Sequence, residues 1–126
     1  YLLELSRISY ELSTCYPSVL AASALYLARA TLSLRETRID HAVDSNGYWT
    51  KTLQHYSGYS VSELKRPVLI IHAYHRFAAQ SLSNKNVFET ASFDKYKSSK
   101  HKGVSLITAL RVGELGLHGD ATTLKE

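Results

Sequence analysis

The sequence has 126 residues, of which 44% are hydrophobic and 21% charged, and these proportions exclude an intrinsically disordered chain. Its length fits one domain with a core of its own, and six glycines and two prolines are too few for the turns of a β-sandwich or barrel. The net charge of +4 permits contact with nucleic acid or an acidic partner without requiring it, and the single cysteine, Cys15, points to a reducing compartment.

Residues 1–6 have the pattern of the last turns of a helix, with Leu2, Leu3 and Leu5 on its buried side. Because the sequence opens inside this pattern and contains no methionine, we expect it to be cut from a longer polypeptide, with the first helix truncated. Residues 8–16 are predicted to form a connector.

Residues 17–33 are predicted to form a central helix, with Pro17 in its first turn and Arg29 as its only charge. A helix that is hydrophobic on all sides lies inside a core, and its alanines indicate that neighbouring helices approach closely. Five residues interrupt the apolar run, so no membrane span is predicted: Ser18, Ser23, Tyr26, Arg29 and Thr31.

A polar surface loop is predicted over residues 34–47, followed by a short helix over 49–56. Ser60 and Glu63 have the spacing of a capping box at the start of a long helix that runs to about residue 81. Pro67 should leave one carbonyl unpaired and bend that helix.

A last helix is predicted over residues 87–98, and apolar character resumes at Val104. From Gly113 the chain is expected to be extended or frayed. The predicted organisation is therefore one all-α domain of five helices over residues 1–112 and a tail over residues 113–126.

The histidines and acidic residues form no convincing active site. His72 and His75 have a spacing that two metal ligands could use, but no third ligand follows, so we predict histidines at the edge of a packed helix face. Cys15 paired with His55 or His75 would resemble a nucleophile and its base, yet a small apolar filler explains it better. The carboxylates Glu36, Asp40 and Asp44 are expected to be solvated. We predict no catalytic, cofactor-binding or metal-binding residue.

A run of lysines near the end of the last helix is the best candidate for an interaction patch. Its members are Lys95, Tyr96, Lys97, Lys100 and Lys102. Lysines around an aromatic ring can contact nucleic acid or another anion. A solvated helix end, with lysines near its negative dipole terminus, explains the same run equally well.

Three ordered blocks of the sequence resemble the C-terminal cyclin fold of A- and B-type mitotic cyclins. They are Y-L-L-E-L followed by Y-P-S-V-L-A-A-S-A-L-Y-L-A, then Y-W-T-K-T-L-Q-H-Y-S-G-Y-S-V-S-E-L, and finally K-Y-K-S-S-K-H-K-G-V-S. The loop over 34–47 is longer than this family leads us to expect, and residues 81–93 are not clearly similar. The resemblance assigns structural positions to Pro17, Ala21, Ala22, Leu25, Leu27, Trp49, Leu53, Tyr56, Gly58, Tyr59 and Tyr96.

The resemblance implies a five-helix cyclin box whose second helix, at about 17–33, is central. It implies a non-catalytic regulatory subunit that binds and activates a cyclin-dependent Ser/Thr protein kinase in the nucleus or cytoplasm, without a cofactor or small-molecule substrate. In such cyclins an N-terminal box, absent from this sequence, makes most kinase contacts. This half is then expected to give structural support and a secondary interaction surface. The alternative is a cyclin-fold nucleic-acid-binding module of the TFIIB type, but basic residues cluster only between Lys95 and Lys102.

Overall fold

The computed structural model describes residues 1–35, 47–80 and 87–117, and these residues form helices without any strand. The α-helices are α1 (Leu2–Ser6), α2 (Pro17–Arg35), α3 (Lys51–Ser57), α4 (Val61–Gln80) and α5 (Val87–Lys97). Four 3-10 turns join them: η1 (Glu11–Thr14), η2 (Ser99–His101), η3 (Val104–Leu106) and η4 (Val112–Leu115). The prediction of an all-α fold with five helices is confirmed.

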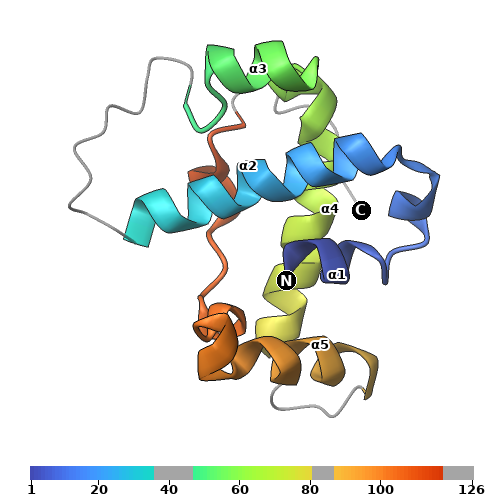
Figure 1. The fold of residues 1–126 in the computed structure, drawn as a ribbon, viewed down its shortest axis with the longest axis vertical. Coiled ribbons are helices and arrows are strands. Elements are labelled where there is room, and N and C mark those ends of the chain that lie inside the picture. The colour runs from blue at the N-terminus through green and yellow to red at the C-terminus, as the bar shows by residue number, and fades with distance from the viewer. Residues whose placement is uncertain (36–46, 81–86, 118–126) are drawn as a thin grey trace.

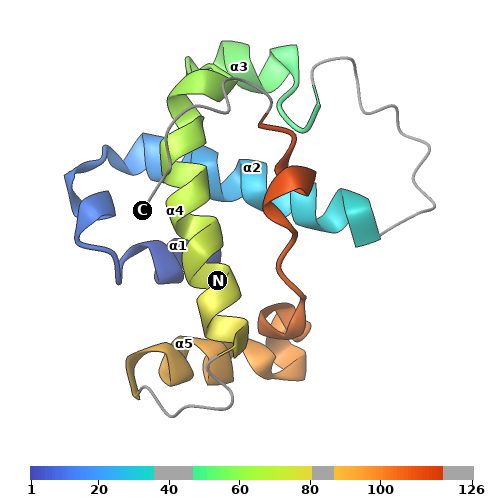
Figure 2. The same cartoon turned by 180° about the vertical axis from the view of Figure 1, so that it is seen from behind.

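Helix α2 crosses α4 near the middle of the molecule, and this pair organises the fold (Figure 1). Helices α3 and α5 lie at opposite ends of α4, and α1 packs against α4 on the same side as α2 (Figures 1 and 2). The central position predicted for residues 17–33 is therefore confirmed.

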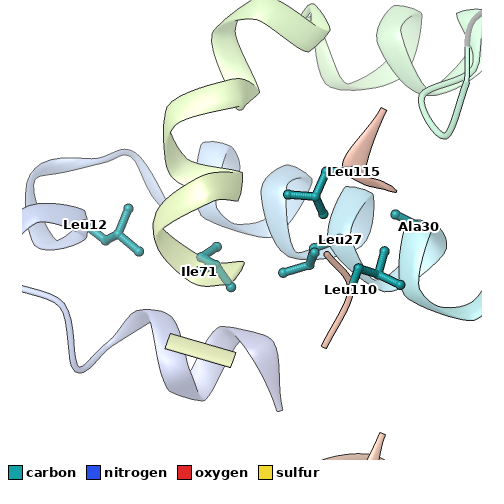
Figure 3. Close-up of a cluster of buried hydrophobic side chains, with 6 residues drawn as sticks. All are labelled: Leu12, Leu27, Ala30, Ile71, Leu110 and Leu115. Carbon is teal, nitrogen blue, oxygen red and sulfur yellow. The ribbon is translucent and has the colours of Figure 1, made fainter. Parts of the chain in front are cut away.

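The core consists of two clusters that share α2. The first joins α2 to α4 and to the end of the chain through Leu12, Leu27, Ala30, Ile71, Leu110 and Leu115 (Figure 3). The second joins α2 to α4 and to the segment before α3 through Ala22, Tyr26, Trp49, Leu64 and Val68. Small residues on α2 thus face its neighbours, as the alanine content predicted.

One face of α2 is not buried, and here the prediction was wrong. Ala21 is exposed, and the side chains of Leu25 and Leu32 keep 44% and 49% of their surface in solvent. The reason is geometric, because α4 crosses α2 on one side and five-residue α1 covers little of the other. The same apolar face makes residues 17–34 long and hydrophobic enough to cross a membrane, although α2 packs as a core helix on α4.

The segment around α3 is held by hydrogen bonds that its sequence encodes. Thr50 Oγ1 accepts the Leu53 N–H at 3.2 Å, and Gly58 ends the helix in the left-handed conformation at φ 75°. Trp49 is buried and donates its Nε1–H to the Tyr59 carbonyl at 2.9 Å. This closes the loop between α3 and α4.

Helix α4 begins with one half of the predicted capping box and continues through buried Pro67. The Ser60 N–H donates to Glu63 Oε2 at 2.8 Å, and this bond lowers the pKa of the Glu63 carboxyl. The Ser60 hydroxyl also donates to this oxygen, at 2.7 Å, instead of capping a backbone N–H.

Residues 107–117, which we call the C-terminal strap, run beside α4 and cross α2 (Figure 2), and they carry Leu110 and Leu115 into the core. The buried Tyr26 hydroxyl donates to the Leu115 carbonyl at 2.8 Å, and burial raises the pKa of this phenol to about 12. The division into a domain over 1–112 and a tail over 113–126 stays a prediction. Within that tail, however, residues up to 117 pack on the domain.

Several predictions concern residues outside the described ranges. These are the solvated carboxylates Glu36, Asp40 and Asp44, the surface loop from residue 36 to 46 and the tail from residue 118.

Candidate interaction surfaces

The exposed face of α2 forms the floor of an apolar groove with a volume of about 390 Å³. The floor consists of Ala21, Ala24, Leu25, Ala28 and Leu32. One wall comes from Tyr1 and from Leu2 and Leu3 of α1, and the other from Val104 in η3 and Ile107 just after it. We call this feature the α2 groove.

The groove follows from helical periodicity. Residues 21, 25, 28 and 32 recur at intervals of four and three, so they form one stripe along the helix. Alanine leaves a hollow where a larger side chain would fill the space, and the leucines line it. A hollow stripe of this kind accepts the apolar face of another helix.

Two polar groups that line the groove, the Thr31 hydroxyl and His75 Nε2, are already engaged. The Thr31 hydroxyl donates to the Leu27 carbonyl at 2.7 Å, and His75 Nε2 lies 3.1 Å from the Ile107 carbonyl oxygen. With these bonds made, the surface offers mainly apolar contact. The α2 groove is therefore better suited to bind a row of apolar side chains than a charged ligand.

One end of the groove is held together by contacts between α1 and α5. The Glu4 carboxylate pairs with Lys95 and accepts the Tyr96 hydroxyl at 3.0 Å. The Tyr1 ring lies 5.9 Å from the His75 ring and 5.6 Å from the Tyr96 ring. These contacts fix the short α1 helix as a wall of the groove.

The structure divides the predicted lysine patch into two parts. Lys95 and Tyr96 bind Glu4, and Lys97 lies 3.9 Å from Asp94. Hydrogen bonding to Lys95 lowers the pKa of the Glu4 carboxyl, and the same bond raises that of Lys95. The sequence did not predict that Glu4 binds Lys95, because Glu4 lies 91 residues earlier in the chain.

The remaining two members of the patch are Lys100 and Lys102, which lie exposed at and just after η2. As an interaction patch, the five residues stay a prediction.

His72 and His75 lie inside the structure, with only 2% and 3% of their surface exposed. Their Nε2 atoms lie 2.7 Å from the Leu110 carbonyl oxygen and 3.1 Å from that of Ile107. Burial lowers the pKa of both imidazoles. Both histidines therefore serve to hold the C-terminal strap.

The other candidate chemistry is not brought together. Within residues 1–35, 47–80 and 87–117, no three or more His, Cys, Asp or Glu side chains gather as metal ligands would. Cys15 packs half-buried against the first core cluster, and His55 lies exposed on α3. The nucleophile hypothesis gains no support from this arrangement.

Comparison with known proteins gives a consistent result. The family described as "Cyclin, C-terminal domain" matches residues 1–110. A protein of Hydra vulgaris named "G2/mitotic-specific cyclin-B" is 38% identical over 111 residues, which are 88% of this chain and 26% of that protein.

Two plant proteins are similar to the same extent. "Cyclin-A2-2" of Arabidopsis thaliana is 36% identical over 86% of this chain and 21% of its own length.

"Cyclin-A3-1" of Oryza sativa subsp. japonica is 38% identical over 85% of this chain and 24% of its own length. The chain thus spans about a quarter of the length of the relatives that it matches. No solved structure gives a significant match.

Proposed function

Because the chain belongs to the family of cyclin C-terminal domains, we propose that it is part of a cyclin that binds and activates a cyclin-dependent Ser/Thr protein kinase. The proposed mechanism is allosteric: the whole cyclin binds the active kinase conformation more tightly and so shifts the kinase population toward it. In this role the chain is a non-catalytic regulatory part that acts in the nucleus or cytoplasm and controls cell division. The names of its relatives, mitotic-specific cyclin-B and A-type cyclins, support this proposal.

Within such a protein, the proposed role of this region is mainly structural support, and the α2 groove is the surface that provides it. The proposed occupant is a helix from the part of the full-length protein that precedes Tyr1. The 111 matched residues are only 26% of the Hydra vulgaris relative, and Tyr1 itself lines the groove. A preceding segment would therefore reach the groove directly.

The observation that carries this assignment is the apolar stripe on an otherwise well-packed helix. Leu25 and Leu32 each expose more than 40% of their surface, and the alanines between them leave a hollow. Covering such a patch removes apolar surface from water, at about 25 cal/mol for each Å². This gain would fix the C-terminal domain against the rest of the cyclin.

The test uses the full-length protein and two matched variants. Leu25→Asp places a carboxylate in the groove, whereas Leu34→Asp places one on the same helix outside it. The two leucines are 44% and 45% exposed. We expect Leu25→Asp to make the protein sensitive to protease and to lower the kinase activity that it supports, and Leu34→Asp to change neither.

Two outcomes would contradict the proposal at different levels. If the wild-type full-length protein retained and activated no kinase, the cyclin role would be rejected. If wild type activated a kinase and Leu25→Asp did so equally well, only the role of the groove would be rejected.

The nucleic-acid-binding alternative is not favoured. Lys95 and Lys97 lie beside carboxylates, whereas Lys100 and Lys102 form no ion pair with a carboxylate among residues 1–35, 47–80 and 87–117. We retain these lysines as part of a proposed secondary interaction surface for a protein partner.

A further inference from the structure

We propose that His72 and His75 form a pH-sensitive latch that holds the C-terminal strap on α4, and that protonation of these histidines releases the strap and with it one wall of the α2 groove. The latch goes beyond the proposed kinase role and does not depend on it.

The latch consists of two parallel contacts from one helix to one segment. The two histidines lie three residues apart on α4, and their partners, Leu110 and Ile107, lie three residues apart on the strap. A carbonyl oxygen only accepts hydrogen bonds, so each imidazole must carry its proton on Nε2. In this tautomer the Nδ1 atom bears a lone pair.

Protonation would add a hydrogen to Nδ1, and the environment does not accommodate it. His75 Nδ1 is buried and has no hydrogen-bond partner among the residues that the structure describes. A charged imidazolium with a buried, unpaired N–H is costly, so the latched strap favours the neutral form.

Neighbouring positive charges on α4 add to this preference. From α4 itself, Arg76 acts on His72 and His72 acts on His75, and both effects lower the pKa of the imidazole concerned. From α1, the edge-to-face Tyr1 ring covers His75. The two carbonyl groups of the strap act in the opposite direction, because their hydrogen bonds raise the pKa of both imidazoles, but burial has the larger effect and lowers it.

The direction of the pH effect follows from these lowered pKa values. When the strap is released, both histidines return to their ordinary pKa near 6.5. The released state therefore binds more protons, and the latch weakens as the pH falls below about 6.5. Above that pH the latch is at full strength.

The strap and the groove are connected through shared residues. His75 and its partner Ile107 both line the α2 groove, and Val104 lies on the same wall. Release of residues 107–110 from α4 would move this wall. Mild acid should therefore loosen whatever occupies the groove.

The test is hydrogen exchange of the full-length protein at pH 7.5 and 5.5, corrected for intrinsic exchange rates. The reporters are the Ile107 and Glu114 amides, which are hydrogen-bonded within the strap region. If the latched histidines stay neutral, the opening equilibrium should rise about tenfold for each histidine over this range, and so up to about 100-fold for both.

The key variant is the double substitution His72→Gln and His75→Gln. Glutamine keeps an N–H donor that can reach the carbonyl but does not titrate, so the pH dependence of strap opening should disappear. His55→Gln changes an exposed histidine on α3 and should leave the wild-type dependence intact.

The proposal is overturned if wild type exchanges equally at both pH values, or if the double glutamine variant keeps the wild-type pH dependence. Should that variant fail to fold, NMR titration of wild-type His72 and His75 decides the question. Both must titrate below about 6.5. Titration of either histidine at or above that value would reject the latch.

Discussion

The two faces of α2 have almost the same composition but different surroundings. On the inner face, Tyr26, Leu27 and Ala30 are 1% exposed or less, because α4 and the C-terminal strap cover them. On the outer face, Leu25 and Leu32 remain almost half exposed above a hollow of alanines. The difference shows that the inner face builds the domain, whereas the outer face is available to bind something else.

The largest expected difference in stability is between alanine substitutions of two leucines on opposite faces of α2. Leu27→Ala should lower the free energy of unfolding by about 2–5 kcal/mol, because it opens a cavity among fully buried side chains. Leu25→Ala should cost about 1 kcal/mol or less in the 126-residue chain, since Leu25 is already 44% exposed. Urea unfolding followed by circular dichroism measures both values.

The same substitutions can test in the full-length protein whether the outer face of α2 is covered. If a preceding helix fills the α2 groove there, Leu25→Ala should become more destabilising than in the 126-residue chain. An equal cost in both would mean that the outer face stays uncovered.

A second pair uses alanines. Ala30→Leu should cost about 1–3 kcal/mol, because Ala30 has no exposed surface and the larger side chain would overpack the first core cluster. Ala28→Leu projects into the α2 groove and should leave the stability of the 126-residue chain nearly unchanged. Comparable losses in thermal unfolding for both variants would contradict the distinction between the faces.

A smaller effect is expected where the inner face holds the strap. Tyr26→Phe removes the hydroxyl that donates to the Leu115 carbonyl at 2.8 Å, and should cost about 0.5–1.5 kcal/mol. Tyr48→Phe is the control, because its hydroxyl contacts the Glu114 carbonyl at a longer 3.4 Å and lies exposed. Denaturant unfolding should rank Tyr26→Phe as the more destabilising change.

The smallest effect is expected at the rim of the groove. Glu4→Gln removes the surface ion pair with Lys95, and the unfolding midpoint at neutral pH should shift little. Because that pairing lowers the pKa of Glu4, its contribution exists above the ordinary carboxyl pKa of 4.5 and is lost as the pH falls below it. A large shift at neutral pH, or one insensitive to added salt, would show that the rim matters more than its exposure suggests.

Much of the fold could be predicted because it rests on local patterns. The run over 17–33, with apolar residues on every side, predicted a central helix, and α2 spans Pro17–Arg35. The spacing of Ser60 and Glu63 predicted the start of α4, which begins at Val61. Such signals operate within a few residues along the chain, so the sequence displays them directly.

The candidate sites could be predicted only in part. Lys95 and Tyr96 were recognised as a charged and aromatic pair, but their partner Glu4 lies more than 90 residues earlier in the chain. His72 and His75 were predicted at the edge of a packed face, whereas the strap covers them and uses their Nε2 atoms. Each assignment depended on a contact between distant parts of the chain.

By itself the sequence determined that the protein is helical, that residues 17–33 form its central helix and that it belongs with the cyclins. Helix propensity, capping and periodicity are properties of short stretches, which explains the success with the helices, whereas the relation to the cyclins came from the resemblance of three sequence blocks. Only the tertiary structure decided which face of α2 is buried. All sides of that helix are apolar, so periodicity cannot distinguish them, and the choice depends on where α4 and the C-terminal strap cross it.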